Sequence, residues 1–197
     1  MGDIKSAAEI AREKLEKIGA PTDAERIKWK YGPEGEKLAA RYLKEDTVNL
    51  AAEAKKFDDK ARLYVAAGVS DILLRNISLP RNDAARKTNK KAMDGLKLLK
   101  NNKTAAENIF SRMQHVLDHY VQEGAKQKQQ AYEALKADFD AKVQQAIRQK
   151  TGVNAKVKVD IEKQPQFQEE WQRLQAQMEA QYINLLDDYK KELAAIN

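Results

Sequence analysis

The chain has 197 residues, of which 42% are hydrophobic and 34% are charged, and its formal net charge is +6. It has no cysteine, which excludes disulfide bonds, thiolate metal ligands and a cysteine nucleophile. Glycine and proline number only eight and four, fewer than proteins rich in strands and turns use. Because good helix formers dominate and apolar residues recur at helical spacing, the composition predicts an all-α protein rather than a disordered chain.

Residues 1–102 are expected to form a compact N-terminal helical bundle. The most apolar stretch is interrupted by Arg62, Asp71 and Arg75, so it predicts a core helix rather than a membrane span. The charged N-terminus does not resemble a signal peptide, and we therefore expect a cytoplasmic protein. The helices predicted in this part cover residues 4–18, 23–30, 33–44, 48–57, 60–77 and 82–100.

Residues 103–197 are expected to form a long antiparallel, coiled-coil-like helical hairpin. Its first arm reaches Lys150 and is interrupted only by Gly124 and a polar stretch around it. Its second arm covers 166–195 and carries a single apolar seam, which favours one partner helix. We expect the pairing to be tightest between residues 132–147 and 167–182. The seam residues are Phe167, Trp171, Leu174, Met178, Tyr182, Leu185, Tyr189 and Leu193.

The segment between the two arms, 151–164, has a different pattern. Apolar and polar residues alternate in it with a period of two, which is typical of a strand. One interpretation is an extended connector over the end of the hairpin. The other is a β-like edge that binds a protein partner, or a second copy of the chain. The residues of this candidate partner-binding edge are Val153, Ala155, Val157, Val159 and Ile161.

Positive charge is concentrated between residues 75 and 103. Only Asp83 and Asp94 oppose the nine basic residues of this segment, which leaves a net charge of +7. The segment is either a solvated helix face, a site for nucleic acid or ribosomal RNA, or a site for an acidic protein or lipid surface. With few aromatic residues to stack on bases, phosphate contacts would dominate RNA binding. The candidate residues are Arg75, Arg81, Arg86, Lys87, Lys90, Lys91, Lys97, Lys100 and Lys103.

No motif of the sequence indicates catalysis. The two histidines, His115 and His119, share a helix face at a spacing suited to metal ligation, but no second cluster supplies further ligands. We interpret them as solvated or helix-capping side chains. Phosphate-binding glycine loops and nucleophile elbows are absent from the sequence. We therefore expect no enzyme activity, catalytic residue, metal or cofactor.

Two resemblances carry some information. The opening Asp3-Ile4-Lys5-Ser6-Ala7-Ala8-Glu9-Ile10-Ala11, with Glu16-Lys17-Ile18-Gly19, resembles a family of uncharacterised bacterial helical proteins of unknown function. That likeness implies a bacterial, cytoplasmic protein and no particular site. The final helix, 171–196, resembles the closing helix of ribosome recycling factor through Tyr182-Ile183 and Leu185-Leu186 followed by Lys190-Lys191-Glu192. We interpret the second likeness as convergence, because the N-terminal part does not match that factor.

These observations favour a non-enzymatic binding factor associated with RNA or the ribosome. It would dock through the basic helix at 82–100 and use the hairpin as an arm. The alternative is a structural or assembly subunit that binds a protein partner, or itself as a homo-oligomer, through the hairpin and its strand-like tip.

Overall fold

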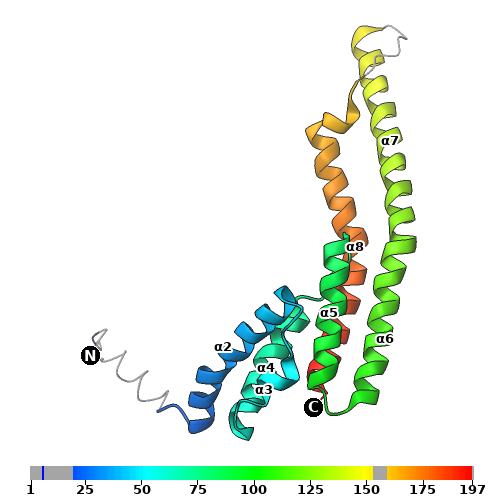
Figure 1. Cartoon of the computed structure of the whole chain (residues 1–197). Coiled ribbons are helices and arrows are strands. Elements are labelled where there is room, and N and C mark those ends of the chain that lie inside the picture. The colour runs from blue at the N-terminus through cyan, green and yellow to red at the C-terminus, as the bar shows by residue number, and fades with distance from the viewer. Residues whose placement is uncertain (1–5, 7–19, 153–158, 197) are drawn as a thin grey trace. The chain divides into compact units, whose positions relative to one another are not determined.

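The computed structural model describes residues 6, 20–152 and 159–196. The described residues form helices and no strand, which confirms the all-α prediction. The predicted helix at 4–18 lies outside the described residues, apart from Ser6. The elements in chain order are α2 (Asp23–Lys44), α3 (Leu50–Ala54), α4 (Asp59–Arg75), α5 (Asp83–Leu99), α6 (Lys103–His119), the π-helical turn η1 (Tyr120–Gly124), α7 (Ala125–Thr151), the 3₁₀ turn η2 (Ile161–Lys163) and α8 (Pro165–Ala195) (Figure 1).

The chain divides into two compact units, residues 1–72 and 73–197. The division lies inside α4, whereas the sequence predicted a boundary between residues 102 and 103. In the structure α5 packs against α6, so the basic helix and the helical pair belong to the same unit. None of the described helices is long and apolar enough to span a membrane.

In the first unit, α2 is one helix where the sequence predicted two. It begins at a capping box in which the Thr22 hydroxyl accepts from the Glu25 N–H and the Glu25 carboxylate accepts from the Thr22 N–H. Pro33 lies inside the helix, although proline removes a backbone donor and usually ends helices. The predicted break is therefore wrong, because α2 packs closely against α4 on both sides of Pro33.

Glycines make this close approach of α2 and α4 feasible. A Cβ atom built on Gly35 would lie 2.1 Å from the carbonyl oxygen of Val65, and one on Gly68 would lie 2.3 Å from that of Gly32. No real Cβ atom fits at such distances, so the two backbones touch where side chains are absent. The buried apolar residues along this part of α4 are Ala61, Val65 and Val69.

The sequence predicted a core helix at 60–77, but α4 buries only one of its faces. The side chain of Leu63 is 72% exposed, and buried residues recur every four positions along one face. The helix start agrees with the sequence, because Asp58 Oδ1 accepts from the Ala61 N–H at 2.8 Å.

In the second unit, one buried amide joins the loop after α4 to α5. Asn89 Oδ1 accepts from the Ser78 N–H at 3.0 Å, and Asn89 Nδ2 donates to the Ser78 carbonyl at 2.6 Å. Both polar groups of the side chain are therefore satisfied inside the protein. This pair determines where the loop enters α5, and so where the neighbouring cations lie.

The helical pair of the second unit is α8 packed antiparallel on the continuous helix α6–η1–α7 (Figure 1). Against α7, the ring of Tyr132 lies edge-on to Phe167 at 5.6 Å and to Trp171 at 5.0 Å between centroids. Against α6, Arg112 pairs with Glu192. The pairing thus includes α6 as well as residues 132–147, where the tightest pairing was predicted.

The apolar seam of α8 differs from the predicted one in its second half. Leu185 is 44% exposed, whereas its neighbour Leu186 is buried. The buried side chain one position after Met178 is Glu179. Glu179 accepts a hydrogen bond from Tyr120 of the π-helical turn, whereas Leu193 at the end of the predicted seam is buried as expected.

The strand-like tip is not supported by the described residues. Val153, Ala155 and Val157 lie outside them, and no strand occurs within them. Val159 is half-buried in the connection, and Ile161 is buried at the start of the 3₁₀ turn η2. Ile161 thus packs within its own chain, so it does not offer the exposed edge that the alternating pattern predicted.

Candidate nucleic-acid interface

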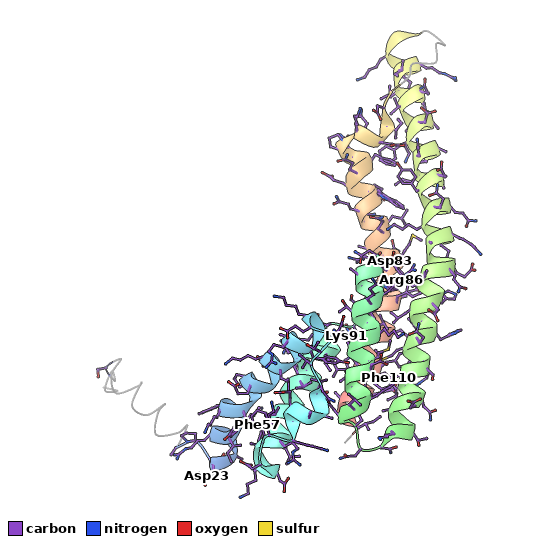
Figure 2. All side chains as sticks on the ribbon, viewed as in Figure 1. Asp23, Phe57, Asp83, Arg86, Lys91 and Phe110 are labelled. Carbon is purple, nitrogen blue, oxygen red and sulfur yellow. The ribbon has the colours of Figure 1, made fainter. Side chains whose placement is uncertain are left out.

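Three exposed cations occupy the N-terminal half of α5: Arg86, Lys87 and Lys90, which we call the basic face. The side chain of Asn82 caps the start of α5. Arg86 forms only a loose, exposed ion pair with Asp83, in which Arg86 Nη1 lies 3.6 Å from Asp83 Oδ1 (Figure 2). The basic face stays exposed because α5 is amphipathic and buries its opposite side. The buried residues of that side are Asn89, Ala92, Met93, Gly95 and Leu96.

Lys97 and Lys100 are predicted cations that serve contacts within the protein. Lys97 Nζ lies 3.5 Å from Glu107 Oε1 and 5.6 Å from the centroid of the Phe110 ring. Lys100 Nζ donates to the carbonyl of Ile196 at 2.8 Å, and burial lowers the pKa of this amine. These two lysines join α5 to α6 and to the end of α8.

The other predicted cations are spread over several elements. Arg75 ends α4 and Lys103 begins α6, and both are exposed. Lys91 is half-buried on α5. Arg81 lies in the loop before α5, where it pairs with Glu179 of α8. The structure therefore gathers only part of the predicted set into one surface.

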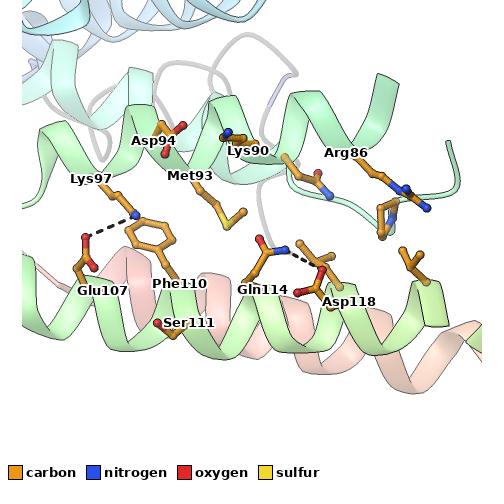
Figure 3. A pocket seen from close by; sticks show the side chains of 14 residues that line it. Arg86, Lys90, Met93, Asp94, Lys97, Glu107, Phe110, Ser111, Gln114 and Asp118 are labelled. Carbon is orange, nitrogen blue, oxygen red and sulfur yellow. Dashed lines mark hydrogen bonds and ion pairs between the residues drawn. The ribbon is translucent and has the colours of Figure 1, made fainter. Parts of the chain in front are cut away.

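A groove of about 580 Å³ runs between α5 and α6 (Figure 3). Within it, Lys97 pairs with Glu107, and Gln114 Nε2 donates to Asp118 Oδ1 at 2.9 Å. Cations and carboxylates are equal in number along it, so this α5/α6 groove carries no net charge. Its charged lining residues are Arg86, Lys90, Lys97, Asp94, Glu107 and Asp118.

A polar cluster around the buried carboxylate of Glu179 joins the π turn to α8 and to the loop before α5. The Tyr120 hydroxyl donates to Glu179 Oε1 at 2.6 Å, and Arg81 donates to the other carboxylate oxygen of Glu179. Glu179 is only 9% exposed, so both hydrogen bonds compensate for a carboxylate removed from water. The cluster holds three segments of the second unit together.

The ionisation of this cluster follows from its geometry. Burial by itself would raise the pKa of Glu179, but the hydrogen bonds from Tyr120 and Arg81 outweigh it, and the pKa lies below the usual value. Burial, followed by the hydrogen bond to the carboxylate, raises the pKa of Tyr120 to about 12. At neutral pH the cluster consists of a carboxylate, a neutral phenol and a guanidinium.

A second groove, of about 540 Å³, lies beside this cluster, and we call it the π-turn groove. Three cations and one carboxylate line it: Arg81, Arg86, Lys128 and Glu179. It is therefore more positive than the α5/α6 groove, with a net charge of +2 on its side chains. The uncharged residues of its lining are Pro80, Tyr120, Val121, Gly124, Ala125, Gln172, Gln175 and Ala176.

The two histidines form no metal site in the described part of the chain. His115 is exposed, and His119 Nδ1 lies 3.0 Å from the Tyr182 hydroxyl. No group of three or more potential ligands occurs among the described residues. His119 thus has a hydrogen-bonding role between α6 and α8.

The sequence predicted Arg81 and Arg86 of the π-turn groove but did not indicate Tyr120, Lys128 or Glu179. Tyr120 and Glu179 are 59 positions apart, and Lys128 lies outside the basic segment. The only available signals were Gly124 in a helical pattern and a carboxylate, Glu179, next to the seam residue Met178. Neither signal indicates which residues meet, because that depends on the register of α8.

Comparison with known proteins identifies a family but no activity. A family model described as a family of unknown function (DUF6657) matches residues 51–195, from α3 to the end of α8. Curated proteins and solved structures give no match. The matched part includes the basic face, both grooves and the helical pair. The chain therefore belongs to the family of unknown function DUF6657.

Proposed function

We propose that the chain is a non-enzymatic, cytoplasmic binding factor that associates with RNA, ribosomal RNA included, through the basic face of α5. The observation that carries this proposal is the exposure of Arg86, Lys87 and Lys90 together on one helix surface. Exposed cations attract phosphate backbones and release counterions when they bind. The face is close to the positive π-turn groove, since Arg86 lines that groove as well.

The side chains of the basic face determine how it would recognise RNA. The basic face contains no aromatic residue, so bases have nothing on it to stack against. Lysine and arginine contacts to phosphate carry little sequence information. We therefore expect binding that depends on salt and on the shape of the RNA rather than on its sequence.

The helical pair is the second component of the proposal. α7 and the first half of α8 extend beyond α5 in the second unit (Figure 1). Edge-on contacts of Tyr132 and Phe139 with Phe167 support this pairing. Such a pair could act as a rigid arm once α5 is bound to RNA.

The test is co-sedimentation with purified ribosomes, and binding to a labelled mixed-sequence RNA, at low and high salt. The variant is the double substitution Lys87→Gln and Lys90→Gln, and the control is Lys126→Gln with Lys142→Gln on α7. Both double variants lose two positive charges, but only the first alters the basic face. We expect the first to reduce the salt dependence, with the slope of log K against log salt falling by about 1.4, and the control to change it less. Absence of sedimentation at both salt concentrations would refute the proposal.

The described residues give less support to the assembly-subunit alternative. It depends mainly on the tip, whose residues 153–158 lie outside the described part, and Ile161 is buried. Sedimentation of the protein with ribosomes only in the presence of a third protein would favour that alternative.

A further inference from the structure

The π-turn groove combines positive charge with fixed polar groups. Its cations come from three different places: Arg81 from the loop before α5, Arg86 from α5 and Lys128 from α7. Its only carboxylate, Glu179, already accepts hydrogen bonds from Arg81 and Tyr120. The positive charge of the groove is therefore incompletely neutralised, unlike that of the α5/α6 groove.

The guanidinium of Arg81 is held in place before any ligand arrives. One of its nitrogens binds Glu179, which is in turn fixed by Tyr120. The Arg81 side chain nevertheless remains 63% exposed, so the other N–H groups of its planar fork are accessible. An arginine positioned in this way loses less side-chain entropy when it binds an anion.

Lys128 and two glutamines supply the other polar side chains of the groove lining. With its amide turned to satisfy both neighbours, Gln175 Oε1 accepts from Lys128 Nζ at 2.8 Å and from Trp171 Nε1 at 3.3 Å. The amide nitrogen of Gln175 is then left as a donor. Gln172, one turn earlier on α8, is exposed and adds a further amide to the lining.

We propose that the π-turn groove binds a phosphoryl group, held by Arg81, Arg86 and Lys128 with the amides of Gln172 and Gln175. Arginine forks suit the geometry of phosphate oxygens, and lysine adds a point charge. A groove of about 540 Å³ falls within the size range of ligand sites and accommodates a phosphorylated ligand of nucleotide size. The phosphoryl group belongs either to a free phosphate ester or to the backbone of RNA. This inference goes beyond the proposed function, because Lys87 and Lys90 take no part in it.

Calorimetric titration with inorganic pyrophosphate, adenosine diphosphate and uncharged adenosine tests the proposal. We expect pyrophosphate and the diphosphate to saturate one site, and adenosine to give no binding. Lys128→Gln should weaken both phosphate ligands about 10-fold or more, because one charge-assisted contact is lost. Lys126→Gln removes the same charge two residues away on an exposed position outside the groove lining, and should leave the affinity within about 2-fold.

A second variant tests whether weaker binding by Lys128→Gln reflects a folding defect or the lost charge. Gln172→Glu adds a negative charge at an exposed position of the lining and should also weaken the phosphate ligands, with an unchanged melting temperature. Wild-type protein that shows no saturation by pyrophosphate, diphosphate or RNA overturns the proposal. Equal affinity of Lys128→Gln and wild type for all of them does so too.

Competition separates the two sources of the phosphoryl group. If the ligand is RNA backbone, a short RNA displaces pyrophosphate and Lys128→Gln weakens RNA binding as well. If the ligand is a free phosphate ester, pyrophosphate binds in the presence of RNA. The double variant Lys87→Gln with Lys90→Gln should keep its pyrophosphate affinity, so failure of the RNA proposal and failure of the groove proposal give different results.

Discussion

The hydroxyl of Tyr120, on the π-helical turn, donates to the buried carboxylate of Glu179 on α8 at 2.6 Å. Arg81 binds the same carboxylate from the loop before α5. The pair therefore fixes the register of α8 and one wall of the π-turn groove together. Its loss should affect both stability and the groove.

The first prediction concerns the hydroxyl of Tyr120. Tyr120→Phe should lower the free energy of unfolding by about 1–2 kcal/mol, because the carboxylate of Glu179 loses a hydrogen bond while it stays buried. Urea unfolding followed by circular dichroism measures the change. The control is Tyr189→Phe on α8, whose ring contacts Arg112 and should keep that contact. An equal loss in both variants would show that the Glu179 bond is not responsible.

The second prediction concerns alkaline pH. The pKa of Tyr120 is raised to about 12 in the folded protein, from an ordinary value of 10.0. The contribution of the neutral Tyr120 hydroxyl to the free energy of unfolding is thus fully present below pH 10. This contribution is lost as the pH rises through about 12. We expect the stability difference between wild type and Tyr120→Phe to shrink over this range. A difference that is constant from pH 9 to pH 12 would contradict the raised pKa.

The third prediction concerns acidic pH, where the cluster of Tyr120, Glu179 and Arg81 should lose part of its contribution to stability. The folded-state pKa of Glu179 is lowered, so its contribution to stability is present above the ordinary carboxyl pKa of 4.5 and is lost as the pH falls through the lower folded value. Glu179→Gln should therefore be less stable than wild type at pH 7, and the two should converge below pH 4.5. Thermal melting at a series of acidic pH values measures this convergence. Parallel curves at all pH values would indicate a steric effect instead.

The fourth prediction concerns the glycine contact of the first unit. Gly35→Ala should destabilise that unit by about 1–3 kcal/mol, because the new Cβ would overlap the carbonyl of Val65. Gly32→Ala, three residues earlier on α2, is the matched control, since a Cβ there meets nothing within 4 Å. We expect this control to change stability less than Gly35→Ala, because its gain in helix propensity is opposed by crowding of the new Cβ against the Pro33 ring. Hydrogen exchange in peptides of α2 and α4 measures both effects, and equal destabilisation by the two variants would count against the close contact.

The fifth prediction concerns the buried amide of Asn89. Asn89→Ala leaves the N–H and the carbonyl of Ser78 without their partner, which should cost about 1–3 kcal/mol. Asn101→Ala, at an exposed loop position, should change stability by less than about 0.5 kcal/mol. Chemical unfolding of the two variants measures the difference. Similar midpoints for both would show that water replaces the amide at Ser78.

Only part of the candidate nucleic-acid interface could be predicted from the sequence. The charge pattern indicated that cations gather between residues 75 and 103, and Arg86, Lys87 and Lys90 do share an exposed face. It could not show that Arg81 and Lys100 are engaged in contacts with α8 and its C-terminal end. Such contacts join residues almost a hundred positions apart, and local pattern holds no information about them.

The sequence by itself determined which segments are helical and where most helices begin and end. Propensity, capping residues such as Asp58 and Asn82, and the 3.6-residue period act locally, so they can be read along the chain. Only the tertiary structure decided that α2 continues through Pro33, that Leu186 and not Leu185 is buried, and that Glu179 meets Tyr120. These features depend on which backbones come close enough to touch, and that is a property of the packed helices and not of any single segment.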